Sequence, residues 1–377
     1  MRYCRRCILP DTRPNLRLGE DGICNACKTH ESRPTIDYAA RKILFQEVVK
    51  HARSRSTGYD CVIPVSGGKD STWQVVTCLD YGLNPLAVTW KTPARTVIGG
   101  QNLANLVSLG VDHIDYQVNP KVERKFMLEA LERFGSTAIP MHLALFSIPL
   151  TIAARFSIPL VIWGENSAFE YGSLDEARTG FKMDREWLRT FGVTHGTTAE
   201  DWVSPSLTRR ELTPYFAPTE EELSSKGVSA IFLGYYFAWD PEMSLAVASK
   251  HGFRPLDAPP RTGYYPYADI DDDFISIHHW LKWYKFGFTR LFDNLSLEIR
   301  NGRMSRTEAV EIVRERGDQT PREDIALFCA FVGISTARFY EICERFRNLN
   351  IWENRDGVWR IKDFLIPDWK WEERKQA

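Results

Sequence analysis

A glycine-rich turn carries the strongest chemical signal in the chain, and it consists of Ser66, Gly67, Gly68, Lys69, Asp70 and Ser71. Glycines let the backbone approach an anion closely, and a helix that begins near Ser71 points its free N–H groups at the same place. Lys69 adds a positive charge, and the two serine hydroxyls add hydrogen-bond donors. This combination predicts a phosphate-binding loop.

The spacing separates this loop from two other phosphate-binding patterns. A Walker A loop reads G-x-x-x-x-G-K-[S/T] and a dinucleotide-binding loop reads G-x-G-x-x-G, and neither fits residues 66–71. An ordinary glycine-rich turn is the simpler alternative, but the hexapeptide, the preceding strand and the following helix all favour a ligand site. Asp70 has two readings, because it can bind Mg²⁺ or order the loop, or cap the helix that follows.

A second polar group follows the apolar run at residues 159–163. It consists of Gly164, Glu165 and Asn166, followed by Phe169, Glu170 and Tyr171. Polar residues at the carboxyl end of a parallel strand lie where doubly wound sheets bind ligands. Glu165 or Glu170 could therefore orient ammonia, bind Mg²⁺ or hold an amide, whereas the alternative is a solvated loop. Trp90 ends another strand and could lie beside adenine, although core packing explains it equally well.

The cysteines predict a metal site at the N-terminus. Four of the eight form two C-x₂-C pairs with 16 residues between them, namely Cys4, Cys7, Cys24 and Cys27. This spacing is typical of a Cys4 zinc site, and such a closed site leaves no position for a substrate, so we expect the zinc to be structural. Disulfides are the alternative, but a cytosolic chain is kept reduced. The other four cysteines are scattered, which argues against sulfur chemistry.

The elements that must position these residues alternate along the chain. Apolar runs predict strands at residues 61–65, 86–90, 114–118, 160–163 and 230–233. Helical patterns precede or separate them at residues 36–53, 71–81, 102–109, 122–134 and 143–156. This alternation predicts an α/β fold with a doubly wound parallel sheet. After about residue 240 the pattern is mainly helical, at residues 278–286, 306–315, 321–332 and 337–349, and the aromatic segment 358–369 is expected to dock on the body.

We therefore expect three regions, which are a zinc module over residues 1–33, an α/β domain over 34–240 and a mainly helical domain over 241–377. Lys and Arg number 48 against 49 for Asp and Glu, and this balance does not favour a protein that binds long nucleic acids. The longest apolar stretch, residues 139–162, is interrupted by Pro149, Arg155 and Pro159. The N-terminus lacks the apolar centre of a signal peptide. These features predict a soluble, cytoplasmic protein without membrane insertion.

The loop VSGGKDS after a strand resembles the PP-loop of the ATP pyrophosphatase superfamily, whose fold is HUP-like and whose members cleave ATP between the α and β phosphates. The chain as a whole resembles the N-acetyl sugar amidotransferase family of bacterial surface-polysaccharide pathways. The motifs that carry this resemblance are YCRRC, GICNAC, VSGGKDS, VTWKT, GGQNL, IPLVIWGENSAFEYG, WLKWYKFGFTR and EIRNGRMSR. They extend from Cys4 to about Arg306, and nothing can be matched beyond Thr320. Ser167 and Ser173 stand where we would expect Pro and Gly.

The resemblance implies an ATP-dependent amidotransferase that converts the acetamido group of a nucleotide-activated sugar to an acetamidino group. ATP would adenylylate the amide oxygen, and ammonia would then displace AMP. It implies ATP, Mg²⁺ and structural zinc as cofactors, and a separate glutaminase as the ammonia source, because no glutaminase-type Cys/His pair is apparent. The implied catalytic residues are Lys69, Asp70, Glu165 and Asn166. Loop residues 66–71, Trp90 and Gly164 would bind ATP, and the substrate would contact Glu170, Tyr171, Lys282, Lys285 and Arg290.

Two alternatives stay open at this stage. A PP-loop enzyme that adenylylates a tRNA base is one, because the first 60 residues carry 12 basic and 7 acidic side chains, a local net charge of 12 − 7 = +5. A zinc-stabilised nucleotide-binding scaffold without activity is the other, and the intact loop argues against it.

For Lys282, Lys285 and Arg290, which are expected on one helix, the alternative to substrate contact is a solvated helix face.

Overall fold

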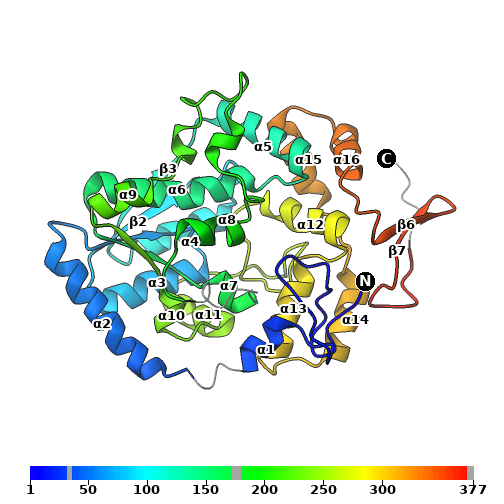
Figure 1. Ribbon diagram of the computed structural model, residues 1–377, viewed down its shortest axis with the longest axis horizontal. Coiled ribbons are helices and arrows are strands. Elements are labelled where there is room, and N and C mark those ends of the chain that lie inside the picture. The colour runs from blue at the N-terminus through cyan, green and yellow to red at the C-terminus, as the bar shows by residue number, and fades with distance from the viewer. Residues whose placement is uncertain (32–35, 172–179, 372–377) are drawn as a thin grey trace.

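A computed structural model describes residues 1–31, 36–171 and 180–371, and its centre is a five-stranded parallel sheet (Figure 1). The sheet order is β3-β2-β1-β4-β5. The strands are β1 (Cys61–Pro64), β2 (Pro85–Trp90), β3 (Asp112–Tyr116), β4 (Leu160–Trp163) and β5 (Ser229–Phe232). The chain reverses its direction of travel across the sheet between β1 and β4, which makes their carboxyl ends the place where such sheets bind ligands. The predicted doubly wound parallel sheet is therefore confirmed.

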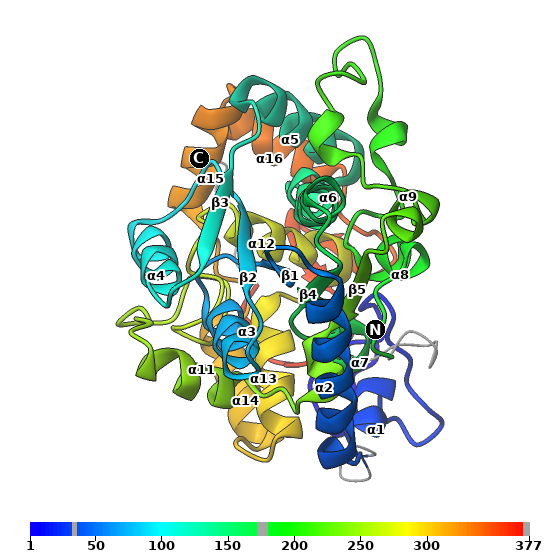
Figure 2. The same ribbon diagram turned by 90° about the vertical axis from the view of Figure 1, so that its left-hand side faces the viewer.

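Helices cover both faces of this sheet (Figure 2). One face carries α2 (Tyr38–Arg55), α3 (Lys69–Asp80) and α4 (Val97–Val107), and the other carries α5 (Pro120–Phe134) and α6 (Ile139–Phe156). Because side chains alternate along a strand, Val62 packs into the core beneath α5 and α6 while Ile63 packs into the core beneath α2, α3 and α4. Both cores are apolar, which fixes the register of β1 and the position at which it ends.

Helix α6 runs through Pro149 without a break, so this proline does not end the apolar stretch. By length and composition α6 could cross a bilayer, and the bent pair α15 (Arg322–Val332) and α16 (Thr336–Glu344) passes the same test jointly. However, 61% of the apolar window of α6 is buried inside the protein. The core helix of a soluble protein has the same character, so this is weak evidence for a span.

Helices predominate after β5, as predicted. Helix α11 (Pro241–Lys250) packs on α3, and α12 (Ile275–Phe286), α13 (Arg290–Arg300) and α14 (Arg306–Arg316) follow. Helix α16 ends at Glu344, earlier than the predicted end at residue 349, and a hairpin of β6 (Trp352–Arg355) and β7 (Val358–Ile361) follows it. The remaining helices are α1 (Asn25–Glu31), α7 (Ser167–Tyr171), α8 (Arg185–Phe191), α9 (Glu220–Ser225) and α10 (Leu233–Tyr236), with 3₁₀ turns at Ala199–Trp202 and Thr213–Tyr215.

The prediction of one helix that contains Lys282, Lys285 and Arg290 is wrong. Helix α12 ends at Phe286 because Gly287 adopts a left-handed conformation with φ +72° and donates its amide to the carbonyl of Trp283. A new helix, α13, begins at Arg290. Arg290 therefore points from a different helix than the two lysines.

The N-terminal cysteine segment packs on the C-terminal helices. Its four cysteines share one apolar core with side chains of α12, α13 and α14, including Trp283, Leu291, Phe292 and Val313. In Figure 1 the blue N-terminal segment lies against α13 and α14. The core of this segment is therefore separate from the two cores of the sheet.

The left-handed glycine in the loop yields a first prediction. Gly67 has φ +90°, and a Cβ atom on it would lie 2.5 Å from the backbone nitrogen of Leu103 in α4. Gly110 has a similar φ of +101° with open space around it. We expect Gly67→Ala to lower the free energy of unfolding by about 2–4 kcal/mol and Gly110→Ala by about 1 kcal/mol, because only the first adds a backbone clash to the conformational strain.

Urea denaturation of both variants measures this difference. Equal losses of stability in Gly67→Ala and Gly110→Ala would contradict the close approach of the loop to α4.

Candidate functional site

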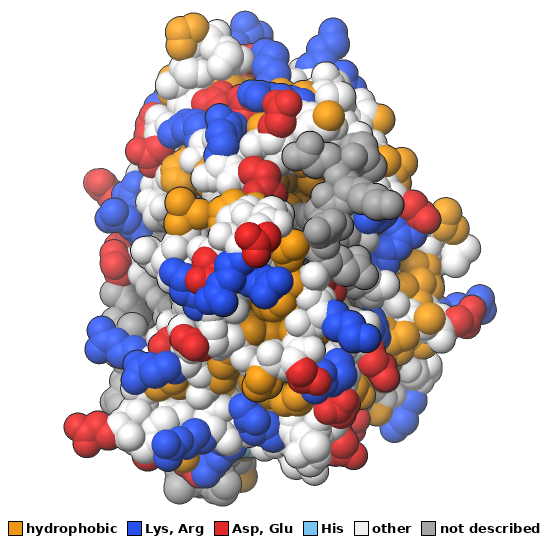
Figure 3. All heavy atoms as spheres, turned by 90° about the vertical axis from the view of Figure 1, so that its right-hand side faces the viewer, with side chains coloured by type: hydrophobic (Ala, Val, Ile, Leu, Met, Phe, Trp, Pro, Cys, Tyr) orange, Lys and Arg blue, Asp and Glu red, His pale blue; other side chains and the backbone are white. Residues whose placement is uncertain are grey.

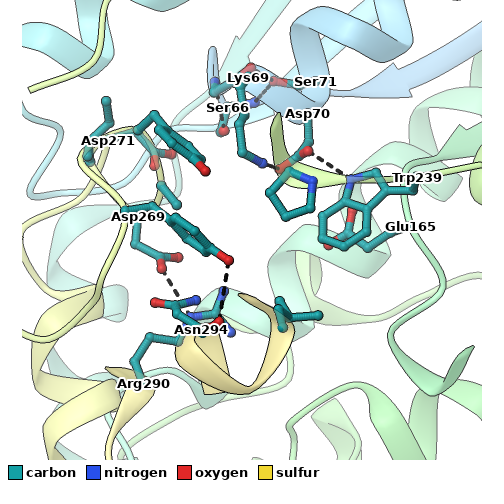
Figure 4. A pocket seen from close by; sticks show the side chains of 17 residues that line it. Ser66, Lys69, Asp70, Ser71, Glu165, Trp239, Asp269, Asp271, Arg290 and Asn294 are labelled. Carbon is teal, nitrogen blue, oxygen red and sulfur yellow. Dashed lines mark hydrogen bonds and ion pairs between the residues drawn. The ribbon is translucent and has the colours of Figure 1, made fainter. Parts of the chain in front are cut away.

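A pocket lies at the carboxyl end of β1 and receives side chains from both halves of the chain (Figure 4). The first half contributes the loop and Glu165, which follows β4. The second half contributes Trp239, the segment that precedes α12 and the first turns of α13. The lining residues are Ser66, Gly68, Lys69, Asp70, Ser71, Glu165, Trp239, Pro241, Tyr265, Tyr267, Ala268, Asp269, Ile270, Asp271, Arg290, Asn294 and Leu297.

The loop presents the N-terminus of α3 to this pocket. The helix begins at Lys69 with Gly68 as its N-cap, and no side chain caps it, so the reading of Asp70 as the N-cap is wrong. The Ser66 hydroxyl accepts from the Gly68 amide at 3.2 Å, and the Ser71 hydroxyl donates to the Gly68 carbonyl at 3.0 Å. An uncapped helix start with free N–H groups is a favourable place for an anion.

Lys69 and Asp70 form an ion pair at the mouth of the loop. The Lys69 Nζ lies 2.6 Å from Asp70 Oδ2, and the lysine side chain is 4% exposed. Trp239 Nε1 donates to Asp70 Oδ1 at 2.9 Å. The lysine ammonium also lies 5.6 Å from the ring of Trp239 and 5.8 Å from that of Tyr267. Lys69 is thus oriented by a carboxylate and two aromatic rings, and its charge faces the pocket (Figure 4).

The opposite wall comes from the C-terminal half. Arg290 Nε donates to Asp269 Oδ2 at 3.2 Å. Tyr265 and Tyr267 stack with ring centroids 4.9 Å apart, and the Tyr265 hydroxyl donates to the buried Glu298 of α13 at 2.5 Å. A cation and two aromatic rings therefore face the phosphate-binding loop across the pocket.

The electrostatics of the pocket are dominated by carboxylates. Burial and the nearby Asp70 raise the pKa of Glu165 to about 7. Burial and the nearby Asp269 raise the pKa of Asp271 to about 6. Burial alone would also raise the pKa of Asp269, but the charge of Arg290 outweighs it and holds this pKa at about 2. Glu165 and Asp271 therefore change protonation state near neutral pH, and a cation bound beside them would favour their ionised forms.

The pocket carboxylates are of the right chemistry for Mg²⁺. Asp70, Glu165 and Asp271 all line it, and carboxylate oxygens are the protein ligands that Mg²⁺ prefers. In the described part of the chain, however, only the four N-terminal cysteines have their potential ligand atoms gathered closely enough to hold an ion without movement. The three carboxylates would therefore hold Mg²⁺ together with phosphate oxygens of a bound nucleotide.

Other predicted site residues have structural contacts instead of pocket contacts. Asn166 is buried, and its side chain accepts from Trp187 Nε1 and donates to the Gly180 carbonyl. The Gly164 carbonyl accepts from Gly234, and a Cβ atom on Gly164 would meet Gln74 at 2.1 Å. These two residues hold the turn after β4 in place.

Trp90 lies in the core beneath α5 and α6, and its Nε1 donates to Glu123 at 3.0 Å. Trp90 does not line the pocket, so its position fits core packing and not contact with adenine. Glu170 is buried and close enough to Glu165 to raise its pKa further. The side chain of Tyr171 lies outside the part of the chain that the structure describes.

Of the three basic residues that were expected to act together, only Arg290 lines the pocket. Lys282 Nζ pairs with the buried Asp293 at 3.2 Å. Lys285 Nζ lies 3.5 Å from the Phe134 carbonyl, and burial lowers its pKa to about 8. Both lysines therefore make contacts inside the protein and do not line the pocket. The alternative that they lie on a solvated helix face is also wrong.

The four N-terminal cysteines fit a tetrahedral metal ion. Their Sγ atoms all lie within 4.8 Å of one another, and Cys7 Sγ is 3.7 Å from Cys24 Sγ. A zinc–sulfur distance of about 2.3 Å in a tetrahedron requires sulfur–sulfur separations of about 3.8 Å. All four are buried and none is in a disulfide. The residues present therefore fit a closed structural zinc site.

The other four cysteines, Cys61, Cys78, Cys329 and Cys343, are buried and none of them lines the pocket. Cys61 and Cys78 are neighbours in the core between the sheet and α3, and burial raises the pKa of Cys61 well above its ordinary value. A neutral, enclosed thiol is a poor nucleophile.

The sequence reasoning missed most of the C-terminal wall, in particular Trp239, Tyr265, Tyr267, Asp269 and Asn294. The acidic run at residues 271–273 and the aromatic connection before it were visible, but nothing in their spacing linked them to the loop. Their approach depends on tertiary contacts such as the hydrogen bond from the Thr96 hydroxyl to the Ile270 carbonyl.

The sheet order, the loop after β1 and the uncapped start of α3 define a doubly wound α/β protein with an anion-binding loop at its switch point, the fold that the resemblance to PP-loop ATP pyrophosphatases implies. Residues 261–365 match the family model described as LPS biosynthesis protein WbpG-like, C-terminal domain. This match confirms the resemblance to a surface-polysaccharide biosynthesis family, and it extends past Thr320, where motifs alone gave no correspondence. It also covers the pocket residues from Tyr265 to Leu297.

Comparison with curated proteins found no match. Among solved structures, a predicted subunit of tRNA methyltransferase from Methanocaldococcus jannaschii is 17% identical, covering 59% of this chain and 86% of its own, with a TM-score of 0.27. NMN synthetase from Francisella tularensis is 13% identical, covering 60% of this chain and 99% of its own, with a TM-score of 0.26. Similarity at this level supports no conclusion about function.

The raised pKa of Glu165 yields a second prediction. The folded protein holds this proton up to about pH 7, whereas the unfolded chain releases it near the ordinary value of about 4.5. Ionisable Glu165 therefore costs stability as the pH rises from about 4.5 to 7. We expect Glu165→Gln to gain stability relative to the wild type over this interval, with the difference constant below it and above it.

Denaturant unfolding at a series of pH values measures this difference, with Glu315→Gln as the control because Glu315 is exposed on α14. A Glu165→Gln curve parallel to that of the wild type from pH 4 to 8 would contradict the raised pKa.

Proposed function

We propose that the protein is an ATP-dependent amidotransferase that converts an acetamido group of a nucleotide-linked sugar to an acetamidino group in surface-polysaccharide biosynthesis. The observation that carries this proposal is that one pocket joins a PP-loop to a wall supplied by the domain that matches the LPS biosynthesis family. A nucleotide triphosphate and a second substrate would thus meet between the two halves.

The loop side is suited to the triphosphate. The N–H groups at the start of α3 and the hydroxyls of Ser66 and Ser71 would receive the β and γ phosphates, which leave as pyrophosphate. Lys69 would exchange its pairing with Asp70 for a phosphate oxygen, because both partners lie at the same surface of the pocket. Mg²⁺, held by Asp70, Glu165 or Asp271, would supply charge neutralisation for the departing pyrophosphate.

The opposite wall is suited to the sugar substrate. Arg290 presents a guanidinium that can pair with a phosphate or carboxylate, and Asn294 can hydrogen-bond to an amide or hydroxyl group. The stacked rings of Tyr265 and Tyr267 offer an apolar face to a base or a sugar ring. Arg290 thus stays a proposed substrate contact, whereas Asn294, Tyr265 and Tyr267 take the places of Lys282 and Lys285.

The reaction proceeds in two balanced steps. The amide oxygen of the acetamido group attacks the α-phosphorus of ATP, and the bond to pyrophosphate breaks. Ammonia then adds to the activated carbon, a proton is lost and the carbon–oxygen bond breaks, so that AMP leaves with the former amide oxygen. Glu165, with its pKa near 7, is suited to accept the proton from the attacking ammonia.

Ammonia would come from a separate glutaminase, and the reaction would take place in the cytoplasm, where nucleotide sugars and ATP are available. The positions of the other four cysteines support a separate ammonia source, because none of these cysteines lines the pocket. A glutaminase-type nucleophile is therefore lacking beside the loop in the described part of the chain.

A labelling experiment tests the proposal directly. Wild-type protein is incubated with ATP, Mg²⁺, ammonium salt and nucleotide-linked acetamido sugars whose amide oxygen is ¹⁸O. We expect a sugar product one mass unit lighter than the unlabelled substrate, together with AMP that carries the ¹⁸O, as measured by mass spectrometry. Lys69→Ala should lower the rate by at least about 100-fold, because it removes the charge that stabilises pyrophosphate.

Lys121→Ala is the matched control, since Lys121 is exposed on α5 and should leave the rate unchanged. Label in inorganic phosphate instead of AMP would indicate phosphorylation and contradict adenylylation. Modification of tRNA in the absence of any sugar product would favour the base-modifying alternative.

A further inference from the structure

Helix α13 connects the cysteine cluster to the pocket. Its first turns carry Arg290 and Asn294 to the pocket wall, and its last residue, Arg300, lies at the cysteine cluster. Ten residues at about 1.5 Å each separate Arg290 and Arg300 by about 15 Å along the helix axis. Nine of the eleven residues of α13 are buried, so the helix cannot shift without disturbing both ends.

Arg300 is a buried cation that lies against the cysteine cluster. Its side chain is 8% exposed, and its Nη1 and Nη2 atoms have no hydrogen-bond partner in the described part of the chain. The guanidinium lies next to the Cys27 thiol and within electrostatic reach of Cys7 and Cys24. Burial of an unpaired guanidinium costs folding free energy. We therefore expect negative charge beside Arg300 in the metal-loaded protein.

The cysteine cluster would supply that charge once it holds a metal. Four thiolates around one Zn²⁺ carry a net charge of −2, in a core formed with Leu291, Phe292 and Leu295 of α13. Arg5 and Arg6, which lie between Cys4 and Cys7, do not neutralise this charge inside the core, because both are exposed and Arg6 pairs with Glu31. Arg306 also donates to the cluster region, but to the Cys7 carbonyl and not to a sulfur.

We propose that Arg300 is the buried counter-cation of a zinc–thiolate centre and that, through α13, it makes the position of Arg290 and Asn294 depend on the metal. This role goes beyond the proposed reaction and does not depend on it. Arg300 is a positioning residue, since it lies at the opposite end of the helix from the pocket. Charge-assisted N–H···S contacts to the thiolates would satisfy its donors and orient the metal ligands, as groups around zinc sites commonly do.

Zinc retention in the full-length protein tests the first half of this proposal. The rate of zinc release to a chromogenic chelator is compared in the wild type, Arg300→Met, Arg300→Gln and Arg300→Lys. We expect about 10–100-fold faster release from the Met and Gln variants, and a rate close to that of the wild type from the Lys variant, because lysine keeps the charge. Arg314→Gln is the matched control, since Arg314 forms exposed ion pairs with Glu311 and Asp368.

Zinc release at the wild-type rate from folded Arg300→Met or Arg300→Gln would overturn the role of the charge. Fast zinc release from Arg300→Lys would overturn it too. If both neutral variants fail to fold, the comparison of Arg300→Lys with the wild type still decides the question.

Hydrogen–deuterium exchange of the wild-type protein tests the second half. Zinc is removed with a chelator, and exchange is followed for residues 290–300 and, as an internal control, for residues 120–134 of α5. We expect at least a 10-fold loss of protection in α13 and in the segment 263–271 without a change in α5. Unchanged protection of α13 in the zinc-free protein would overturn the coupling, whatever the outcome of the enzymatic assays.

Discussion

The structure depends on one buried helix whose polar side chains find their partners in three separate parts of the chain. Asp293 of α13 pairs with Arg13 of the cysteine segment at 2.8 Å and with Lys282 of α12 at 3.2 Å. Glu298 accepts from Tyr265 and from Arg303. Buried charges are stable only when they are paired, so α13 fixes the relative positions of these parts. In Figure 1 the N-terminal segment lies against α13, with which it shares an apolar core.

This constraint explains why the pocket needs both ends of the chain. The loop of residues 66–71 is held in place by the packing of Gly67 against α4 and by the hydrogen bonds that the Ser66 and Ser71 hydroxyls form within the loop. The facing wall of the pocket includes Arg290 and Asn294 of α13. Apolar side chains of α13 pack in the core that the N-terminal cysteines complete. A face of that N-terminal and C-terminal assembly is seen in Figure 3, where basic and acidic side chains are interspersed with apolar ones and no single charge dominates. That mixed surface agrees with the near-zero net charge of the chain.

The sequence predicted the part of the site that is local and missed the part that is tertiary. The loop, its strand and its helix are contiguous, so residues 66–71 could be assigned a role from their order alone. The helix predicted over residues 278–286 ends where α12 ends. The expectation that Lys285 and Arg290 share a helix failed, because the left-handed Gly287 separates them. The buried polar residues of α13 resemble those of a surface helix, so periodicity could not indicate that Asn294 and Glu298 face inward.

The charges of the pocket also constrain how a nucleotide can bind. Lys69 and Arg290 contribute two positive charges to its lining, whereas Asp70, Glu165, Asp269 and Asp271 can contribute four negative ones, which gives 2 − 4 = −2 when all are ionised. A free triphosphate would be repelled by such a surface. Burial, to which the neighbouring charges of Asp70 and Asp269 add, raises the pKa of Glu165 and of Asp271. A divalent cation bound with the triphosphate would offset this repulsion and would favour the ionised forms of Glu165 and Asp271. In the proposed reaction, the acids that would exclude ATP alone would favour its magnesium complex, and Glu165 would be deprotonated when ammonia loses a proton.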